Sequence, residues 1–288
     1  MTFVYSHARM RASAGWFVLS LCASCCNDAL MKGVSPQLNA WQVACLRCLF
    51  GTLTLLPYLG WQGRQSFRTV HLRLHVLRGT MFFAGLALWS YGVRHAPMAT
   101  ATLVGFTVPL FVLLLAPVVL KERVESASWL AGFGGLVGIA TICTAGSQGL
   151  WTTNALVFLA AAFLFALLDV LNKKYISRES MSCMLFYSTL TATVLLTFPA
   201  LYTTTHFPDL RDILLLWGSG MGGNVLLYAL LKALEHAPAS RLAPLRYLEI
   251  LLSAAIGYVA FGEVPTMQIY RGGAIILLAT FLTAYRKN

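Results

Sequence analysis

The sequence predicts an all-α integral membrane protein with ten transmembrane helices arranged as two inverted five-helix repeats, and three observations support this. Hydrophobic residues make up 58% of the 288-residue chain, whereas charged residues make up 11%. The apolar residues fall into ten stretches of roughly 18–22 residues, the length that an α-helix needs to cross the hydrocarbon core of a bilayer. The second half of the chain also matches the first at an offset of 141 positions.

Five of these stretches form the expected first repeat, residues 13–144, and the other five form the second, residues 152–285. Short polar segments separate them, so no soluble domain is expected. The segment Ala145-Gly146-Ser147-Gln148-Gly149 is the expected linker between the repeats. In chain order the expected helices are 13–31, 40–59, 74–93, 98–119, 126–144, 152–171, 181–201, 212–231, 242–261 and 267–284.

The duplication depends on particular residues at equal spacing. The tripeptide His95-Ala96-Pro97 recurs as His236-Ala237-Pro238, and Asp28, Lys32 and Glu122 recur as Asp169, Lys173 and Glu263. Five crossings leave the chain on the opposite side of the membrane, so the second repeat is expected to be inverted relative to the first. A duplicated membrane domain of this kind is typical of transporters.

The distribution of positive charge predicts the orientation of the chain. If both termini are cytoplasmic, fifteen of the twenty-one lysines and arginines, Arg78 among them, lie in cytoplasmic segments, as the positive-inside rule requires. The net charge of +11 is therefore explained by orientation, and no nucleic-acid partner is expected. The opposite loops hold Lys32, Arg94 and Arg211, while Arg47, Arg246 and Arg271 lie at membrane depth.

Other features that suggest processing, metal binding or catalysis have simpler explanations. Arg9 and Arg11 precede an apolar stretch as in a secretory signal, but residues 13–32 have a counterpart at 154–173, so this segment is expected to be retained. Cys22-x-x-Cys25 and Cys45-x-x-Cys48 lie inside apolar helices, where they are expected to pack rather than bind zinc or form disulfides. Without a phosphate-binding glycine loop or a catalytic histidine motif, the sequence predicts no cofactor, no metal and no enzyme activity.

Charged residues at membrane depth are the first candidates for a substrate site, because each is costly unless it faces water or a partner. Asp28 follows Asn27 on the polar face of the first helix, and Asp169 is its counterpart in the sixth. Two interpretations stay open for each aspartate. It either pairs with the lysine four residues later and anchors the helix end, or it lines the transport pathway.

Arg246 and Glu249 are three residues apart in the ninth helix, so they share one face well inside the apolar stretch. They either neutralise each other or contact substrate, and contact is favoured because a buried self-neutralising pair is often no more stable than apolar residues. Arg47 has no acid nearby in the sequence and could pair with Asp28 or meet an anionic group of the substrate. The remaining candidate contacts are Trp89, Phe106, Asn224 and Tyr247.

These residues and their spacing resemble the drug/metabolite transporter superfamily, specifically its EamA-type members. The likeness rests on ten helices in two inverted repeats, an Ala-Pro step before helices four and nine, and Lys121-Glu122 and Gly262-Glu263 after them. Within that superfamily, the chain resembles the S-adenosylmethionine transporters of obligate intracellular bacteria. The matching strings are Asn27-Asp28, Tyr91-Gly92, Asp169-x-x-Asn172-Lys173-Lys174, Glu179-Ser180-Met181, Met184-Leu185-Phe186-Tyr187-Ser188 and Ala243-Pro244-x-Arg246-Tyr247-Leu248-Glu249.

The resemblance implies a secondary transporter of the bacterial inner membrane that imports S-adenosylmethionine, in exchange for S-adenosylhomocysteine. The imported compound carries a sulfonium, an ammonium, a carboxylate and an adenine, so its site needs an acid, a base and aromatic faces. Glu249 is the expected partner of a cationic group, Arg246 or Arg47 of the carboxylate, and the three aromatic candidates of adenine or the sulfonium. The same residues suit an exporter of amino acids or cationic amphipathic drugs, which is the alternative function.

Overall fold

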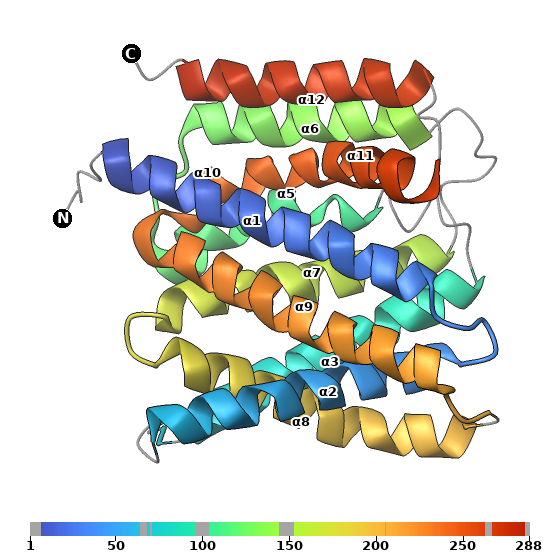
Figure 1. Ribbon diagram of the computed structural model, residues 1–288. Helices are drawn as coiled ribbons and strands as arrows, with labels where there is room; N and C mark the ends of the chain where they lie inside the picture. The colour runs from blue at the N-terminus through green and yellow to red at the C-terminus, as the bar shows by residue number, and fades with distance from the viewer. Residues whose placement is uncertain are drawn as a thin grey trace.

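The computed structural model describes residues 7–63, 68–69, 71–95, 104–143, 153–204, 206–262 and 267–285, and these ranges contain helices but no strand. In chain order the helices are α1 (His7–Lys32), α2 (Ala40–Gln62), α3 (Leu72–His95), α5 (Val108–Leu115), the π-helical turn η2 (Ala116–Leu120), α6 (Ser126–Cys143), α7 (Thr153–Tyr175), α8 (Met181–Thr203), α9 (Leu210–His236), α10 (Ala239–Leu242), the 3-10 segment η3 (Ala243–Leu248), α11 (Glu249–Phe261) and α12 (Met267–Tyr285). They form one bundle in which α1 begins at the end where α12 finishes (Figure 1).

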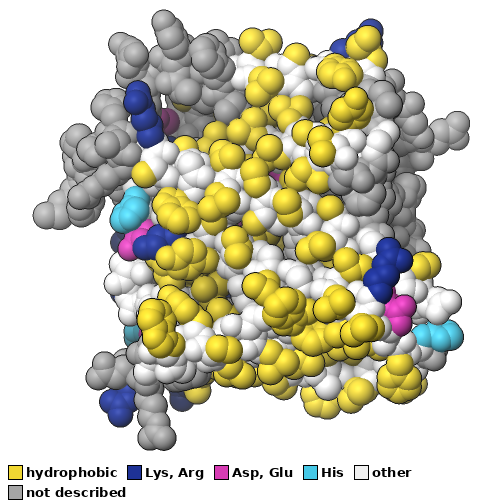
Figure 2. Space-filling view, viewed as in Figure 1, with side chains coloured by type: hydrophobic (Ala, Val, Ile, Leu, Met, Phe, Trp, Pro, Cys, Tyr) yellow, Lys and Arg dark blue, Asp and Glu magenta, His cyan; other side chains and the backbone are white. Residues whose placement is uncertain are grey.

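The surface of this bundle is that of a multi-pass membrane protein, which confirms the predicted all-helical membrane class. On the face shown in Figure 2, hydrophobic side chains fill a broad belt, and most of the charged and histidine side chains gather at the two edges where helices end. The first part of the expected helix 98–119 lies outside the described residues. Among those described, six helices are long and apolar enough to cross a membrane: Met10–Met31, Ala40–Trp61, Leu156–Tyr175, Met181–Thr203, Leu210–His236 and Ala239–Val259.

Polar residues next to the apolar stretches set where several helices begin. Asn39 caps α2 in a capping box, because its side chain accepts from the backbone N–H of Gln42 at 2.9 Å and the Gln42 side chain accepts from the Asn39 N–H at 3.2 Å. Ser180 and Asp209 cap α8 and α9 with single side-chain bonds. These bonds satisfy N–H groups that have no partner within the helix.

Two helix ends share a backbone conformation at equivalent positions of the duplication. Lys121 ends η2 with a φ of 57°, and Gly262 ends α11 with a φ of 66°, so both adopt the left-handed conformation. The two positions are 141 residues apart, the offset at which the halves of the sequence match. The duplication therefore extends to local backbone geometry.

Helices from the two halves of the chain pack against one another in matched pairs. α1 packs on α9 as α3 packs on α7, and α2 contacts α9 as α8 contacts α3. α6 pairs with α12 at one edge of the bundle, and α2 pairs with α8 near the opposite edge (Figure 1). Within that last pair the hydroxyl groups of Thr52 and Thr193, which are 141 positions apart, lie 3.4 Å from each other. Equivalent residues thus meet where equivalent helices pair.

Candidate functional site

Two helices are interrupted at equivalent points of the duplication, and the interruptions meet inside the bundle. α5 begins at Val108 and α11 begins at Glu249, which are 141 residues apart. Phe106 and Thr107 form a turn before α5, and the 3-10 segment η3 precedes α11. The ring of Phe106 stacks on that of Tyr247 with centroids 6.1 Å apart and planes at 24°. Interrupted helices of this kind mark hinges and binding sites in transporters.

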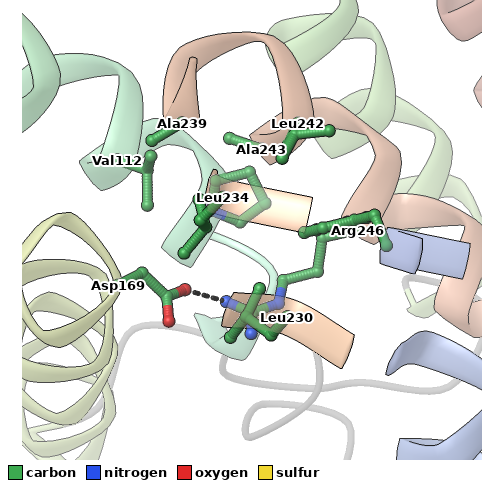
Figure 3. Close-up of a pocket in the computed structure, with 10 residues that line it drawn as sticks. Val112, Asp169, Leu230, Leu234, Ala239, Leu242, Ala243 and Arg246 are labelled. Carbon is green, nitrogen blue, oxygen red and sulfur yellow. Dashed lines mark hydrogen bonds and ion pairs between the residues drawn. The ribbon is translucent and has the colours of Figure 1, made fainter. Parts of the chain in front are cut away.

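An ion pair lies beside this interruption. Arg246 in η3 donates from Nη1 to Oδ2 of Asp169 in α7 at 2.9 Å. The two side chains point toward each other in Figure 3, at a cavity of about 20 Å³ that is otherwise apolar. Such a volume holds roughly one water molecule, so the cavity itself is too small for a larger ligand in this conformation. The other lining residues are Phe17, Pro109, Val112, Leu230, Leu234, Ala239, Leu242 and Ala243.

This pairing corrects two interpretations taken from the sequence. Asp169 does not anchor its helix end through the lysine four residues later, because it pairs with Arg246, while Lys173 Nζ donates to the backbone oxygen of Leu234 at 2.5 Å. Arg246 and Glu249 are likewise not a self-contained pair. Glu249 interacts electrostatically with Arg246, but the bonded partner of the guanidinium is Asp169.

A second group of charged side chains lies where α1 and α2 approach the start of α11. The thiol of Cys25 donates to the backbone oxygen of Glu249 at 3.5 Å, which fixes α1 beside α11. Asp28, an exposed side chain one turn further along α1, interacts electrostatically with both Glu249 and Arg47. The Lys32 side chain lies outside the described residues, so the anchoring interpretation of Asp28 stays a prediction.

Together the two groups form a charged network of five side chains from different helices: Asp28, Arg47, Asp169, Arg246 and Glu249. Three carboxylates face two guanidiniums, so the ionised network carries one net negative charge. A cationic ligand with its own carboxylate could exchange partners within this network without leaving any of its charges unpaired. The arrangement therefore suits a zwitterion that carries one additional positive charge.

The aromatic candidates differ in how accessible they are. Trp89 packs edge-on against Phe158 with centroids 5.1 Å apart, and Phe106 is half-buried. Tyr247 is fully buried in a cluster with Ile139 and Ile276. In this conformation Tyr247 is a packing residue, whereas contact of Trp89 or Phe106 with substrate stays a prediction.

Both asparagine candidates join helices in this conformation. Asn27 is buried, and its side-chain oxygen accepts a hydrogen bond from the hydroxyl of Ser219 in α9. Asn224 donates from Nδ2 to the backbone oxygen of Gly51 at 2.7 Å and to the hydroxyl of Thr54 at 3.0 Å, which ties α9 to α2. The sequence placed both residues correctly in apolar helices but could not identify their partners, which lie more than 150 positions away.

One arginine that the sequence assigns to a cytoplasmic segment is buried among helices. Arg78, counted there as cytoplasmic, is 1% exposed and lies between α3, α7 and α8. Its Nε and Nη2 donate to the side-chain oxygen of Asn172 at 2.9 and 2.5 Å, and Nη1 donates to the backbone oxygen of Met184 at 3.3 Å. The sequence contains one indication of this burial, because position 78 lies inside the predicted helix 74–93.

Close packing at Gly135 leads to a testable prediction. A Cβ at this position would lie 2.2 Å from the ring of Tyr247, and that ring is enclosed on all sides. Gly135→Ala is expected to destabilise the fold by about 2 kcal/mol through overpacking. Thermal unfolding in detergent measures this. Gly223→Ala is the matched control, because a Cβ there meets no atom within 4 Å, and equal melting temperatures for the two variants would contradict the packing role.

Comparisons with known proteins agree with the duplicated architecture. The sequence profile described as the EamA-like transporter family matches residues 13–144 and again residues 152–285. The chain is 36% identical to an S-adenosylmethionine uptake transporter of Rickettsia bellii, over 95% of this chain and 94% of that protein. It is 37% identical to the protein of the same description from Rickettsia prowazekii, over 95% and 92% of the two chains.

Two further comparisons reach more distant proteins. A riboflavin transporter of Vibrio cholerae is 30% identical over 84% of this chain and 82% of its own. A chain of known crystal structure, 17% identical, superposes with a TM-score of 0.81 over 98% of this chain and 100% of its own. At that identity the superposition shows the fold alone.

Proposed function

Because the chain belongs to the EamA-like transporter family, we propose that it imports S-adenosylmethionine by alternating access, in exchange for S-adenosylhomocysteine. The proposal is supported by relatives that carry the name S-adenosylmethionine uptake transporter and align over most of their own length. The single structural observation behind it is the charged network with one net negative charge at the interrupted helix. S-Adenosylmethionine is a zwitterion with one additional positive charge, so it complements this network.

Within the site, Glu249 and Asp28 would hold the sulfonium or ammonium. Arg246 would receive the substrate carboxylate through its planar guanidinium, which can bind a carboxylate with two parallel hydrogen bonds. Asp169 then acts as a positioning residue, because it fixes the direction of Arg246 before substrate arrives. Arg47 is the second candidate for the carboxylate, and Trp89 and Phe106 offer faces for adenine.

We also propose that the chain crosses the inner membrane ten times, as two inverted repeats at 13–144 and 152–285 with both termini in the cytoplasm. The matched helix pairs and the equivalent interruptions before Val108 and Glu249 support the repeats. The start of α1 and the end of α12 at one end of the bundle support an even number of crossings (Figure 1). The excess of lysine and arginine in the segments expected at that end supports its cytoplasmic placement.

Alternating access requires contacts at the cytoplasmic end to break and re-form. There the Glu122 carboxylate accepts from the backbone N–H groups of Ala239 and Ser240, each at 3.3 Å, and from the Ser240 hydroxyl at 3.1 Å. Arg241 pairs with Glu125 beside them. These bonds join the end of the fourth proposed crossing to the start of the ninth. The same two crossings are interrupted deeper in the bundle, before Val108 and before Glu249. Rotation at these interruptions would open the cytoplasmic end without unfolding either helix.

The experiment that tests this function is uptake of labelled S-adenosylmethionine into proteoliposomes containing the purified protein. Vesicles loaded with unlabelled S-adenosylhomocysteine are expected to accumulate label, and empty vesicles to accumulate little. Exchange of a cation for a neutral molecule moves charge, so a potential negative inside should increase accumulation by roughly fortyfold per 100 mV. Equal uptake in loaded and empty vesicles would disprove obligatory exchange. Uptake in neither, with lysine or a cationic dye transported instead, would favour the exporter function.

A further inference from the structure

We propose that an anionic phospholipid headgroup binds in a basic cavity at the proposed cytoplasmic end of η2 and α7, apart from the charged network. This open cavity has a volume of about 490 Å³ and is lined by Val119, Leu120, Lys121, Glu122, Lys173 and Lys174. The proposed topology is needed only to say which leaflet of the membrane supplies this lipid. The cavity and its charges do not depend on the transported substrate.

The charges of the lining leave two ammonium groups for a ligand. Lys173 is engaged by the backbone oxygen of Leu234, and the Glu122 carboxylate is engaged by the first residues of α10. Lys121 and Lys174 are exposed, and neither has a carboxylate partner among the residues that the structure describes. The Lys174 ammonium lies over the ring of its neighbour Tyr175, 5.9 Å from the ring centroid. Two such ammonium groups at one cavity favour an anion such as a phosphate diester.

The backbone conformation at Lys121 suggests a functional role for its side chain. The residue adopts the left-handed conformation that disfavours any side chain with a Cβ, and its equivalent in the second half, Gly262, is glycine. Glycine would form the same turn at Lys121 with less strain. A lysine there places an ammonium at the cavity in spite of that strain, which favours a role for the charge over a role in the turn.

Apolar surface next to the cavity favours a lipid over a soluble anion. Val119 and Leu120 line the cavity itself, and Val118 beside them is 76% exposed. Leu114, one turn earlier on the same face as Val118, is also exposed, so an apolar row leads from the cavity along α5. A phospholipid would place its acyl chain on this row and its phosphate between the two lysines. Anionic lipids are attracted to basic groups at the cytoplasmic surface.

The test is native mass spectrometry of the purified protein with dioleoyl phosphatidylglycerol, and with phosphatidylcholine of the same chains. Wild-type protein is expected to retain the anionic lipid preferentially. Lys121→Asn combined with Lys174→Gln should weaken that retention by roughly twenty-fivefold, about fivefold per lysine. Asparagine is chosen at position 121 because it tolerates the left-handed conformation. The matched control is Lys232→Gln, which removes a lysine paired with Glu235 at the same end of the bundle and should leave retention unchanged.

Three outcomes would overturn the proposal: equal retention of both lipids, unchanged retention by the double variant, or an equal loss in Lys232→Gln. Displacement of phosphatidylglycerol by millimolar inorganic phosphate would identify a soluble-anion site instead. If the double variant does not fold, Lys174→Gln alone is expected to lose about fivefold. No transport is measured here, so failure of the lipid site and failure of the proposed substrate are separate results.

Discussion

Replacing Glu249 with glutamine is expected to reduce S-adenosylmethionine uptake by about a hundredfold while the protein stays folded in the membrane. Glutamine preserves the size of the side chain, and the contact that fixes α1 beside this residue uses the Glu249 backbone oxygen, which the substitution leaves in place. Removing the charge changes the network from one net negative charge to neutral. A bound cation then loses one charged partner, a loss of about 3 kcal/mol, which corresponds to that hundredfold.

Initial rates of labelled uptake into exchange-loaded vesicles measure this effect, and size-exclusion chromatography reports folding. Glu235→Gln is the control, because Glu235 is an exposed glutamate paired with Lys232 near the end of α9. It should transport at the wild-type rate. Wild-type uptake by Glu249→Gln would remove Glu249 from the site.

The positions of the helices could be predicted from the sequence because a membrane imposes a minimum apolar length on each one. Each of the ten expected stretches overlaps one or more of the observed helices. The offset of 141 also locates features that hydropathy does not show, since the left-handed ends at Lys121 and Gly262 are separated by that interval. Duplicated sequence therefore reports duplicated backbone geometry.

The interruption of the ninth helix and the partners of its charges could not be predicted in this way. η3 contains Pro244 and Arg246, but one proline and one charge inside an apolar stretch do not define where a 3-10 segment begins and ends. Arg246 has Glu249 three residues away, so the sequence left a local pair open beside substrate contact, yet its bonded partner is 77 positions earlier in α7. Ion pairs between helices depend on tertiary packing, and one sequence carries no direct record of that packing.

Substitutions at the pair of Asp169 and Arg246 are expected to have the other large effect on uptake. Suitable variants also separate the structural role of the pair from its functional role. Both side chains lie at an otherwise apolar cavity and are largely buried. Asp169→Ala alone leaves the guanidinium without its carboxylate, at a cost of about 3 kcal/mol, so both folding yield and uptake should be lost. Asp169→Leu combined with Arg246→Met removes both charges while roughly preserving volume, and should restore the folding yield.

The uptake rate of that double variant decides what the pair is for. If Arg246 receives the substrate carboxylate, the folded double variant should transport at less than about one hundredth of the wild-type rate. Methionine cannot replace the two parallel hydrogen bonds of the guanidinium. Uptake of an analogue that lacks the carboxylate should be affected far less, a difference that a merely structural role would not produce. Wild-type uptake of S-adenosylmethionine by the double variant would instead make the pair a packing element. Arg47 would then be the base of the site, because it is the other guanidinium of the charged network and already interacts with Asp28.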